Sequence, residues 1–207
     1  MAHSLAAGFA CNELLRSPAA QKIDFSLGPY SINGSGYLKV AAAILNGKMR
    51  VDVNPGRLAP DEGAMYNYPT NELIFRTAAL GSSNIQRMNV VHECTHALIA
   101  NSGFRWDATY THNEAAAYVA GALYVGYAYR SLAREMGTDT SYPFQAPGEP
   151  FATAWTIAES IRNVKGASVS AKDAISLRSV VVASNTYAKY GVTFGTGVGL
   201  SPKRSWD

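Results

Sequence analysis

Apolar residues recur at intervals of three and four in several stretches of the chain, as they do in helices that bury one face. This spacing, with helix-ending signals around it, predicts helices over residues 1–22, 37–45, 83–100, 111–130, 151–164 and 171–190. The helix at 83–100 has the clearest start, because Ser83 can cap it and Gln86 stands three residues on as a capping-box partner. Its expected end is Asn101-Ser102-Gly103.

Alternation of apolar and polar residues instead predicts strands at residues 48–53, 64–68 and 72–77. The last two flank Pro69-Thr70-Asn71, so we expect a hairpin shortly before the predicted helix at 83–100. Residues 23–36 are rich in Gly, Ser and Pro, and there we expect a loop.

These elements predict a single α+β domain over residues 1–207, helix-rich and with a short β-sheet ahead of a central helix. Residues 1–136 would hold the sheet and the central helices. The Pro- and Gly-rich connection at 137–150 is the expected boundary before a helical C-terminal part at 151–191. We expect residues 192–207 to form a loose tail.

Composition narrows the class of protein. Of the 207 residues, 47% are apolar and 16% are charged, as in globular proteins. The net charge is only +3 and no dense Lys/Arg run occurs, which argues against nucleic acid as a partner. No membrane span or signal peptide is evident, so we expect a cytoplasmic chain or one exported by a signal-less route. The two cysteines, Cys11 and Cys94, are too few for a disulfide framework and are expected to be reduced.

One stretch, VVHECTHALIA at residues 90–100, combines residue types that bind metals. His92 and His96 stand four apart, so on a helix both imidazoles lie on one face and reach a common point, where neutral imidazoles bind Zn²⁺. Glu93 points about 100° around the helix, where it misses the metal but can accept a proton from a metal-bound water. The uncharged flanks favour a buried helix. The alternative is a pair of core histidines without a metal.

The residues His92-Glu93-Cys94-Thr95-His96 match the HExxH signature, and the chain here resembles the zincin metallopeptidases. The resemblance implies that His92 and His96 are zinc ligands and that Glu93 is the general base for hydrolysis of a peptide bond. It also implies a zincin-like fold over roughly residues 48–130.

A catalytic zinc needs a third protein ligand besides the two histidines. Glu114 lies eighteen positions past His96, at the start of the next predicted helix, and resembles the third ligand of the gluzincin group. Glu114 could instead complete a capping box with Thr111. Asp107 and His112 remain open as alternative third ligands.

A peptidase also stabilises the negative charge that develops on the attacked carbonyl oxygen. Tyr118, one helical turn after Glu114, and Tyr110, in the segment before it, are the residues that we expect could donate this hydrogen bond. With twelve tyrosines in the chain, a packing role for either is the alternative.

For substrate binding, the strand at 72–77 could be an edge strand to which an extended polypeptide adds as a further strand. The alternative is an ordinary strand within the sheet. By analogy, a small zincin of this kind resembles metallopeptidase domains of bacterial effectors and toxins, which implies an inhibitor or immunity protein as a partner. Two other functions stay open: a non-catalytic binding domain that is stabilised by zinc or degenerate, and an amide hydrolase for a cell-wall or other non-protein substrate.

Overall fold

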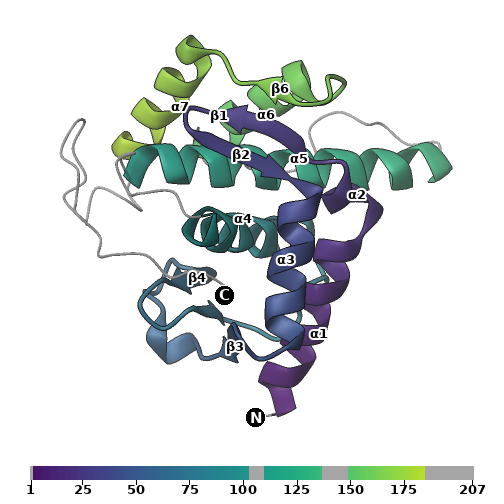
Figure 1. The fold of residues 1–207 in the computed structure, drawn as a ribbon, viewed down its shortest axis with the longest axis vertical. Helices are drawn as coiled ribbons and strands as arrows, with labels where there is room; N and C mark the ends of the chain where they lie inside the picture. The colour runs from purple at the N-terminus through teal and green to yellow at the C-terminus, as the bar shows by residue number, and fades with distance from the viewer. Residues whose placement is uncertain (1, 103–109, 137–148, 185–207) are drawn as a thin grey trace.

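The computed structural model describes residues 2–102, 110–136 and 149–184, and Figure 1 shows their arrangement. The helices in these ranges are α1 (Ala2–Arg16), α2 (Pro18–Gln21), α3 (Gly34–Leu45), α4 (Asn84–Asn101), α5 (Tyr110–Met136), α6 (Glu149–Ile161) and α7 (Ala171–Ala183), with a 3-10 turn at Pro55–Arg57. The strands are β1 (Asp24–Leu27), β2 (Tyr30–Asn33), β3 (Arg50–Val53), β4 (Ala64–Asn67), β5 (Glu72–Phe75) and β6 (Ala167–Ser168). The predicted α+β class, rich in helix, is confirmed.

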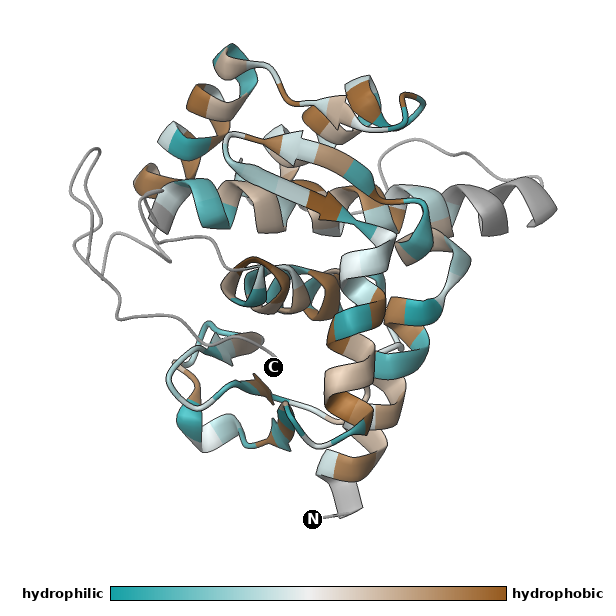
Figure 2. Cartoon of the chain, in the orientation of Figure 1, coloured by the Kyte–Doolittle hydropathy of each residue, from teal (hydrophilic) through white to brown (hydrophobic). Residues whose placement is uncertain are grey.

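Helix α4 lies in the middle of the molecule, between α5 on one side and the sheet that contains β3 and β4 on the other (Figure 1). Every residue from Val90 to Ala100 except His96 is buried, although the helix carries polar as well as apolar side chains (Figure 2). Its start is as predicted, since the Ser83 side chain accepts a hydrogen bond from the backbone N–H of Gln86 at 3.2 Å. A helix buried on nearly all sides can keep polar side chains only where other elements provide partners for them.

The strands form two three-stranded sheets, in the orders β2-β1-β6 and β3-β5-β4. The predicted hairpin before the central helix is confirmed, because β4 and β5 pair antiparallel with Tyr66 opposite Leu73. The prediction that residues 72–77 form an edge strand is wrong. Strand β5 lies between β3 and β4, and its four residues are all buried, which is the pattern of a central strand. Among the described strands, β4 is the edge that lies next to α4.

The expected loop at residues 23–36 is also wrong, since β1 and β2 form a hairpin there. Apolar side chains alternate along it, and the buried ones are Phe25, Leu27, Tyr30 and Ile32. The turn between the strands contains Gly28 with a φ of 56°, a left-handed conformation that glycine adopts without strain. The Gly and Pro residues therefore mark a tight turn inside a hairpin and not a long loop.

Several helix bounds differ from the prediction. Residues 1–22 form two helices, because Ser17 caps α2 at Pro18. Helix α3 starts at Gly34, where Asn33 caps it, three residues earlier than expected. Tyr110 belongs to α5, and α6 spans Glu149–Ile161 in place of 151–164. Helix α7 ends at Ala183, and residues 185–190 of the predicted helix lie outside the described ranges, as does the tail.

The C-terminal part is joined to the N-terminal part by backbone pairing. Strand β6, which follows α6, pairs parallel with β1, and both α6 and α7 pack on α5 (Figure 1). The two sides of the expected boundary at 137–150 therefore share one sheet. None of the described helices is long and apolar enough to cross a membrane.

Candidate metal centre

The close approach of α5 to α4 creates the candidate site. At the crossing, a Cβ atom added to Gly121 would lie 2.8 Å from Cγ of Met88 and 3.3 Å from its carbonyl oxygen, so a larger residue would force Met88 to shift. The helix residues Ala115, Ala116, Ala117 and Ala120 are likewise small and fully buried. Small side chains let the two backbones approach, and a buried acid at the start of α5 is thereby placed above the histidines of α4.

That acid is Glu114, and it meets both histidines. Its Oε2 lies 3.3 Å from Nε2 of His92, and its Oε1 lies 3.5 Å from Nε2 of His96. One ligand atom from each of the three residues falls within 4.8 Å of the other two. His92 and Glu114 are 7% and 4% exposed, so the Glu114 carboxylate is largely desolvated.

The spacing fits a bound metal ion. Ordinary N–H···O hydrogen bonds span about 2.7–3.2 Å, and both contacts lie beyond that range. An ion held tetrahedrally at about 2.0–2.1 Å has ligand atoms roughly 3.3–3.4 Å apart. The two contacts end on different oxygens of Glu114, and one ligand atom from each residue lies within 4.8 Å of the others, so a bound ion would draw the three side chains slightly closer. Two imidazole nitrogens and a carboxylate oxygen also form a donor set that suits zinc. The cluster of His92, His96 and Glu114 can therefore bind a metal ion.

The ring of His96 has a polar partner that the sequence analysis missed. Its Nδ1 lies 2.7 Å from Oδ1 of Asn113, and because an amide oxygen only accepts, Nδ1 carries the proton. The tautomer then leaves the lone pair on Nε2, which faces Glu114. Asn113 directly precedes Glu114 in the sequence and is 3% exposed, and this adjacency is the signal that could have revealed its role.

The ring of His92 is held by packing. It meets the ring of Tyr118 edge-on with centroids 4.7 Å apart, and Tyr118 in turn meets Phe151 of α6 at the same distance. The Nδ1 atom of His92 is buried and makes no hydrogen bond in the described part of the chain. The structure thus places Tyr118 beside His92, one turn of α5 after Glu114.

Glu93 faces away from the ligands, toward the sheet. Its Oε2 accepts a hydrogen bond from the backbone N–H of Tyr66 on β4 at 2.7 Å. Burial raises the pKa of Glu93 to about 7, and the charge of Glu114 also raises it, whereas His96 and the Tyr66 N–H lower it. A buried carboxylate with this pKa, close to the ligands but not among them, is suited to accepting a proton.

Of the two alternative third ligands, His112 is described and is not part of this cluster. His112 is half-buried on α5, with its Nε2 3.2 Å from a guanidinium nitrogen of Arg178 on α7. Burial, followed by the charge of Arg178, lowers its pKa. Asp107 lies outside the described residues, and of Tyr110 only the backbone, at the start of α5, is described.

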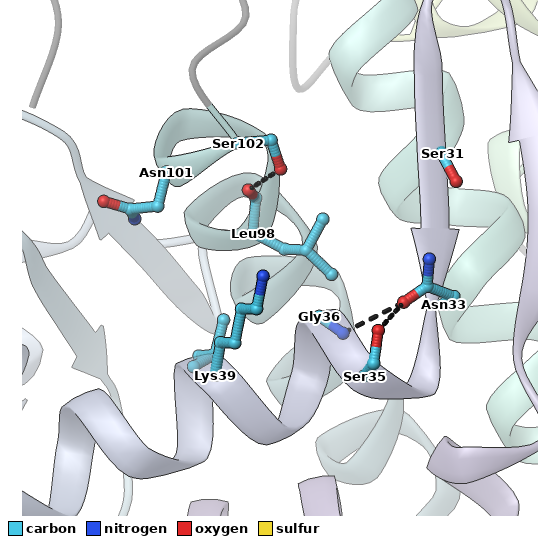
Figure 3. Close-up of a pocket in the computed structure, with 9 residues that line it drawn as sticks. Ser31, Asn33, Ser35, Gly36, Lys39, Leu98, Asn101 and Ser102 are labelled. Carbon is cyan, nitrogen blue, oxygen red and sulfur yellow. Dashed lines mark hydrogen bonds between the residues drawn. The ribbon is translucent and has the colours of Figure 1, made fainter. Parts of the chain in front are cut away.

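A separate pocket of about 150 Å³ lies between β2, the start of α3 and the end of α4 (Figure 3). Its lining includes Asn33, Lys39 and Leu98, and it contains none of the three ligands. Asn33 Oδ1 there accepts hydrogen bonds from the Gly36 N–H and the Ser35 hydroxyl. The pocket is therefore distinct from the metal cluster.

Comparisons with protein-family models, with curated proteins and with solved structures give no match for this chain.

Proposed function

We propose that the chain is a zinc-dependent metallopeptidase of the zincin type, with His92, His96 and Glu114 as the metal ligands. The observation that supports this most strongly is the placement of Glu114, 3.3 and 3.5 Å from the two imidazole nitrogens. Glu114 lies on a different helix from the two histidines and eighteen positions after His96, so local sequence alone does not bring it to them.

Zinc is the metal that this ligand set favours. Three protein ligands of the His-His-Glu type leave a coordination position open, as in catalytic zinc sites and unlike four-ligand structural sites. When bound, zinc would act as a Lewis acid and lower the pKa of a water molecule to about 7. His96, with its tautomer fixed by Asn113, is ready to offer its Nε2 lone pair.

Glu93 is the proposed general base. Glu93 is 9% exposed, and among the described residues its one hydrogen bond is that which Oε2 accepts from β4. Oε1 makes no hydrogen bond within the described residues and is the atom that we propose takes up the proton. The same group then delivers the proton to the leaving amine, because a base that has accepted a proton becomes the acid for the next step.

The substrate that we propose is an extended polypeptide. Strand β4, the edge strand of its sheet among the described elements, borders α4 at Glu93. A peptide added along such an edge would bring successive carbonyl groups past the carboxylate. This replaces β5 as the strand for that role, and an inhibitor protein would use the same edge.

The experiment compares the zinc-loaded wild type with Glu93→Gln and His96→Ala on a mixture of unstructured peptides, with products read by mass spectrometry. Glu93→Gln should keep zinc and lose hydrolysis by roughly 10²–10⁴-fold, the usual contribution of a general base. His96→Ala should lose both zinc and hydrolysis. Glu13→Gln, at an exposed position of α1, is the matched control and should keep both.

Retention of wild-type hydrolysis in Glu93→Gln would remove the mechanism. A wild type that binds zinc but cleaves no peptide would instead favour the zinc-stabilised binding domain.

A further inference from the structure

Strand β4 pairs with β5 along one edge and borders α4 along the other. The backbone N–H of Arg76 donates to the carbonyl oxygen of Gly63 at 3.0 Å, so these two residues form a hydrogen-bonded pair just before β4 begins. In an antiparallel ladder, hydrogen-bonded and non-hydrogen-bonded pairs alternate. Ala64 and Tyr66, opposite Phe75 and Leu73, are therefore in non-hydrogen-bonded pairs. Their N–H groups point away from β5, toward the edge of the sheet.

Glu93 accepts one of these edge N–H groups. The distance of 2.7 Å between Tyr66 N and Glu93 Oε2 is at the short end for an N–H···O bond, as is typical when the acceptor is a carboxylate. The bond joins residues that are 27 positions apart and ties the HExxH helix to the sheet. Holding the Glu93 side chain in one orientation costs rotamer entropy, and this hydrogen bond helps to offset that cost.

We propose that the backbone N–H of Tyr66 is the positioning group for Glu93, holding Oε2 so that Oε1 is the one oxygen left to exchange protons. The catalytic effect of this contact rests on the proposed function, whereas the contact between Tyr66 and Glu93 is independent of it. It also means that this edge N–H is not available to a polypeptide substrate. Tyr66 acts through its backbone, which explains why no side-chain motif in the sequence points to it.

Proline tests the proposal, because it removes the N–H and leaves the rest of the backbone in place. Proline bonds a ring carbon to the nitrogen in place of the hydrogen, and at Tyr66 that hydrogen faces Glu93 on α4. The reference is Tyr66→Ala, because both variants lose the phenol, whose hydroxyl donates to Asn71 Oδ1 at 2.9 Å. The difference between Tyr66→Pro and Tyr66→Ala therefore reports loss of the N–H···Oε2 contact, through removal of the donor and the ring carbon that replaces it.

We expect Tyr66→Pro to have kcat at least about tenfold below that of Tyr66→Ala, with KM and zinc content within about twofold, since a misplaced base slows only the chemical step. Equal kcat values in the two variants would overturn the positioning role.

A second measurement needs neither metal nor activity. Metal-free protein labelled with ¹⁵N-tyrosine gives amide signals from twelve residues, and Tyr66→Phe identifies the Tyr66 signal by its loss. We expect Glu93→Gln to shift the Tyr66 amide more than that of Tyr68, two residues on. An unmoved Tyr66 amide would overturn the contact. This outcome is distinct from failure of the proposed function, in which the amide responds but the zinc-loaded wild type cleaves no peptide.

Discussion

The two histidines of α4 are alike in sequence spacing and in the acid that they share, but the fold holds their rings by different means. His96 donates from Nδ1 to Asn113 Oδ1 at 2.7 Å, and its side chain is 13% exposed. His92 has an aromatic edge, Tyr118, at 4.7 Å and a buried Nδ1 without a hydrogen bond in the described residues. A polar partner fixes the tautomer as well as the orientation, whereas packing fixes the orientation alone.

The difference predicts unequal contributions to metal binding. His92 must carry a proton on Nδ1 when Nε2 binds a metal, and burying that N–H without a partner costs about 1–3 kcal/mol. His96 has no such cost, because Asn113 accepts the proton. We therefore expect zinc affinity to fall more when Asn113, the partner of His96, is replaced than when Tyr118, the partner of His92, is replaced.

The largest effect should come from Glu114, the residue that both histidines share. Glu114→Ala removes a ligand, so zinc affinity should fall by well over the roughly 10–100-fold that loss of a supporting hydrogen bond costs. The measurement is competition with a chromophoric chelator. Tight zinc retained in this variant would place the third ligand elsewhere and would remove the basis of the comparison.

The next effect is on the pH dependence of the free energy of unfolding, to which the two histidines should contribute unequally through the pKa of Glu93. The pKa of Glu93 is about 7 in the folded chain, above its ordinary value of 4.5. The folded state thus holds a proton that the unfolded state releases, and stability is lost as pH rises from about 4.5 through 7. The loss in metal-free protein should be about 3 kcal/mol, measured by urea unfolding.

Glu93→Gln should flatten this pH dependence. His96 lowers the pKa of Glu93, so His96→Ala should steepen the loss of stability, while His92→Ala should change it less. Equal changes from the two histidine variants would show that Glu93 does not distinguish them.

A third prediction concerns Asn113. Asn113→Ala should weaken zinc binding by roughly 10–100-fold, because the His96 ring loses its tautomer and orientation partner. Asn113→Asp, which still accepts the proton, should retain more affinity than the alanine variant. The control is Asn101→Ala, since the Asn101 side chain donates only to a carbonyl of its own helix, that of Ala97. Wild-type affinity in Asn113→Ala would mean that packing alone holds both rings.

The smallest effect is expected at Tyr118. Tyr118→Phe keeps the ring against His92, so zinc affinity should stay within about threefold of wild type. The same variant examines the oxyanion role, because a fall in kcat with unchanged zinc affinity would assign the hydroxyl to catalysis. A loss of zinc affinity as large as that of Asn113→Ala would contradict the contrast between the two rings.

The sequence predicted those parts of the fold and the site that depend on short-range patterns. The α4 start at Ser83, the β4–β5 hairpin and the four-residue spacing of the histidines are all local features. The β1–β2 hairpin was not predicted, because the turn residues Gly28 and Pro29 are equally typical of a loop, although apolar residues alternate on both sides of them.

Features that depend on long-range packing could not be predicted in this way. Strand β5 is central because it also pairs in parallel with β3, and the sequence of a single strand does not determine its neighbours in the sheet. The bond from Tyr66 to Glu93 uses a backbone group that every residue but proline has. Asn113 and Glu114 gain their partners only because Gly121 lets α5 approach α4.

The most direct test of the metal centre is anomalous diffraction at the zinc absorption edge from a crystal of the zinc-loaded chain. The account predicts one peak at about 2.0–2.2 Å from Nε2 of His92, Nε2 of His96 and an oxygen of Glu114, with Glu93 outside the coordination sphere. A peak held by other residues, a fourth protein ligand closing the site, or no peak between α4 and α5 would contradict it.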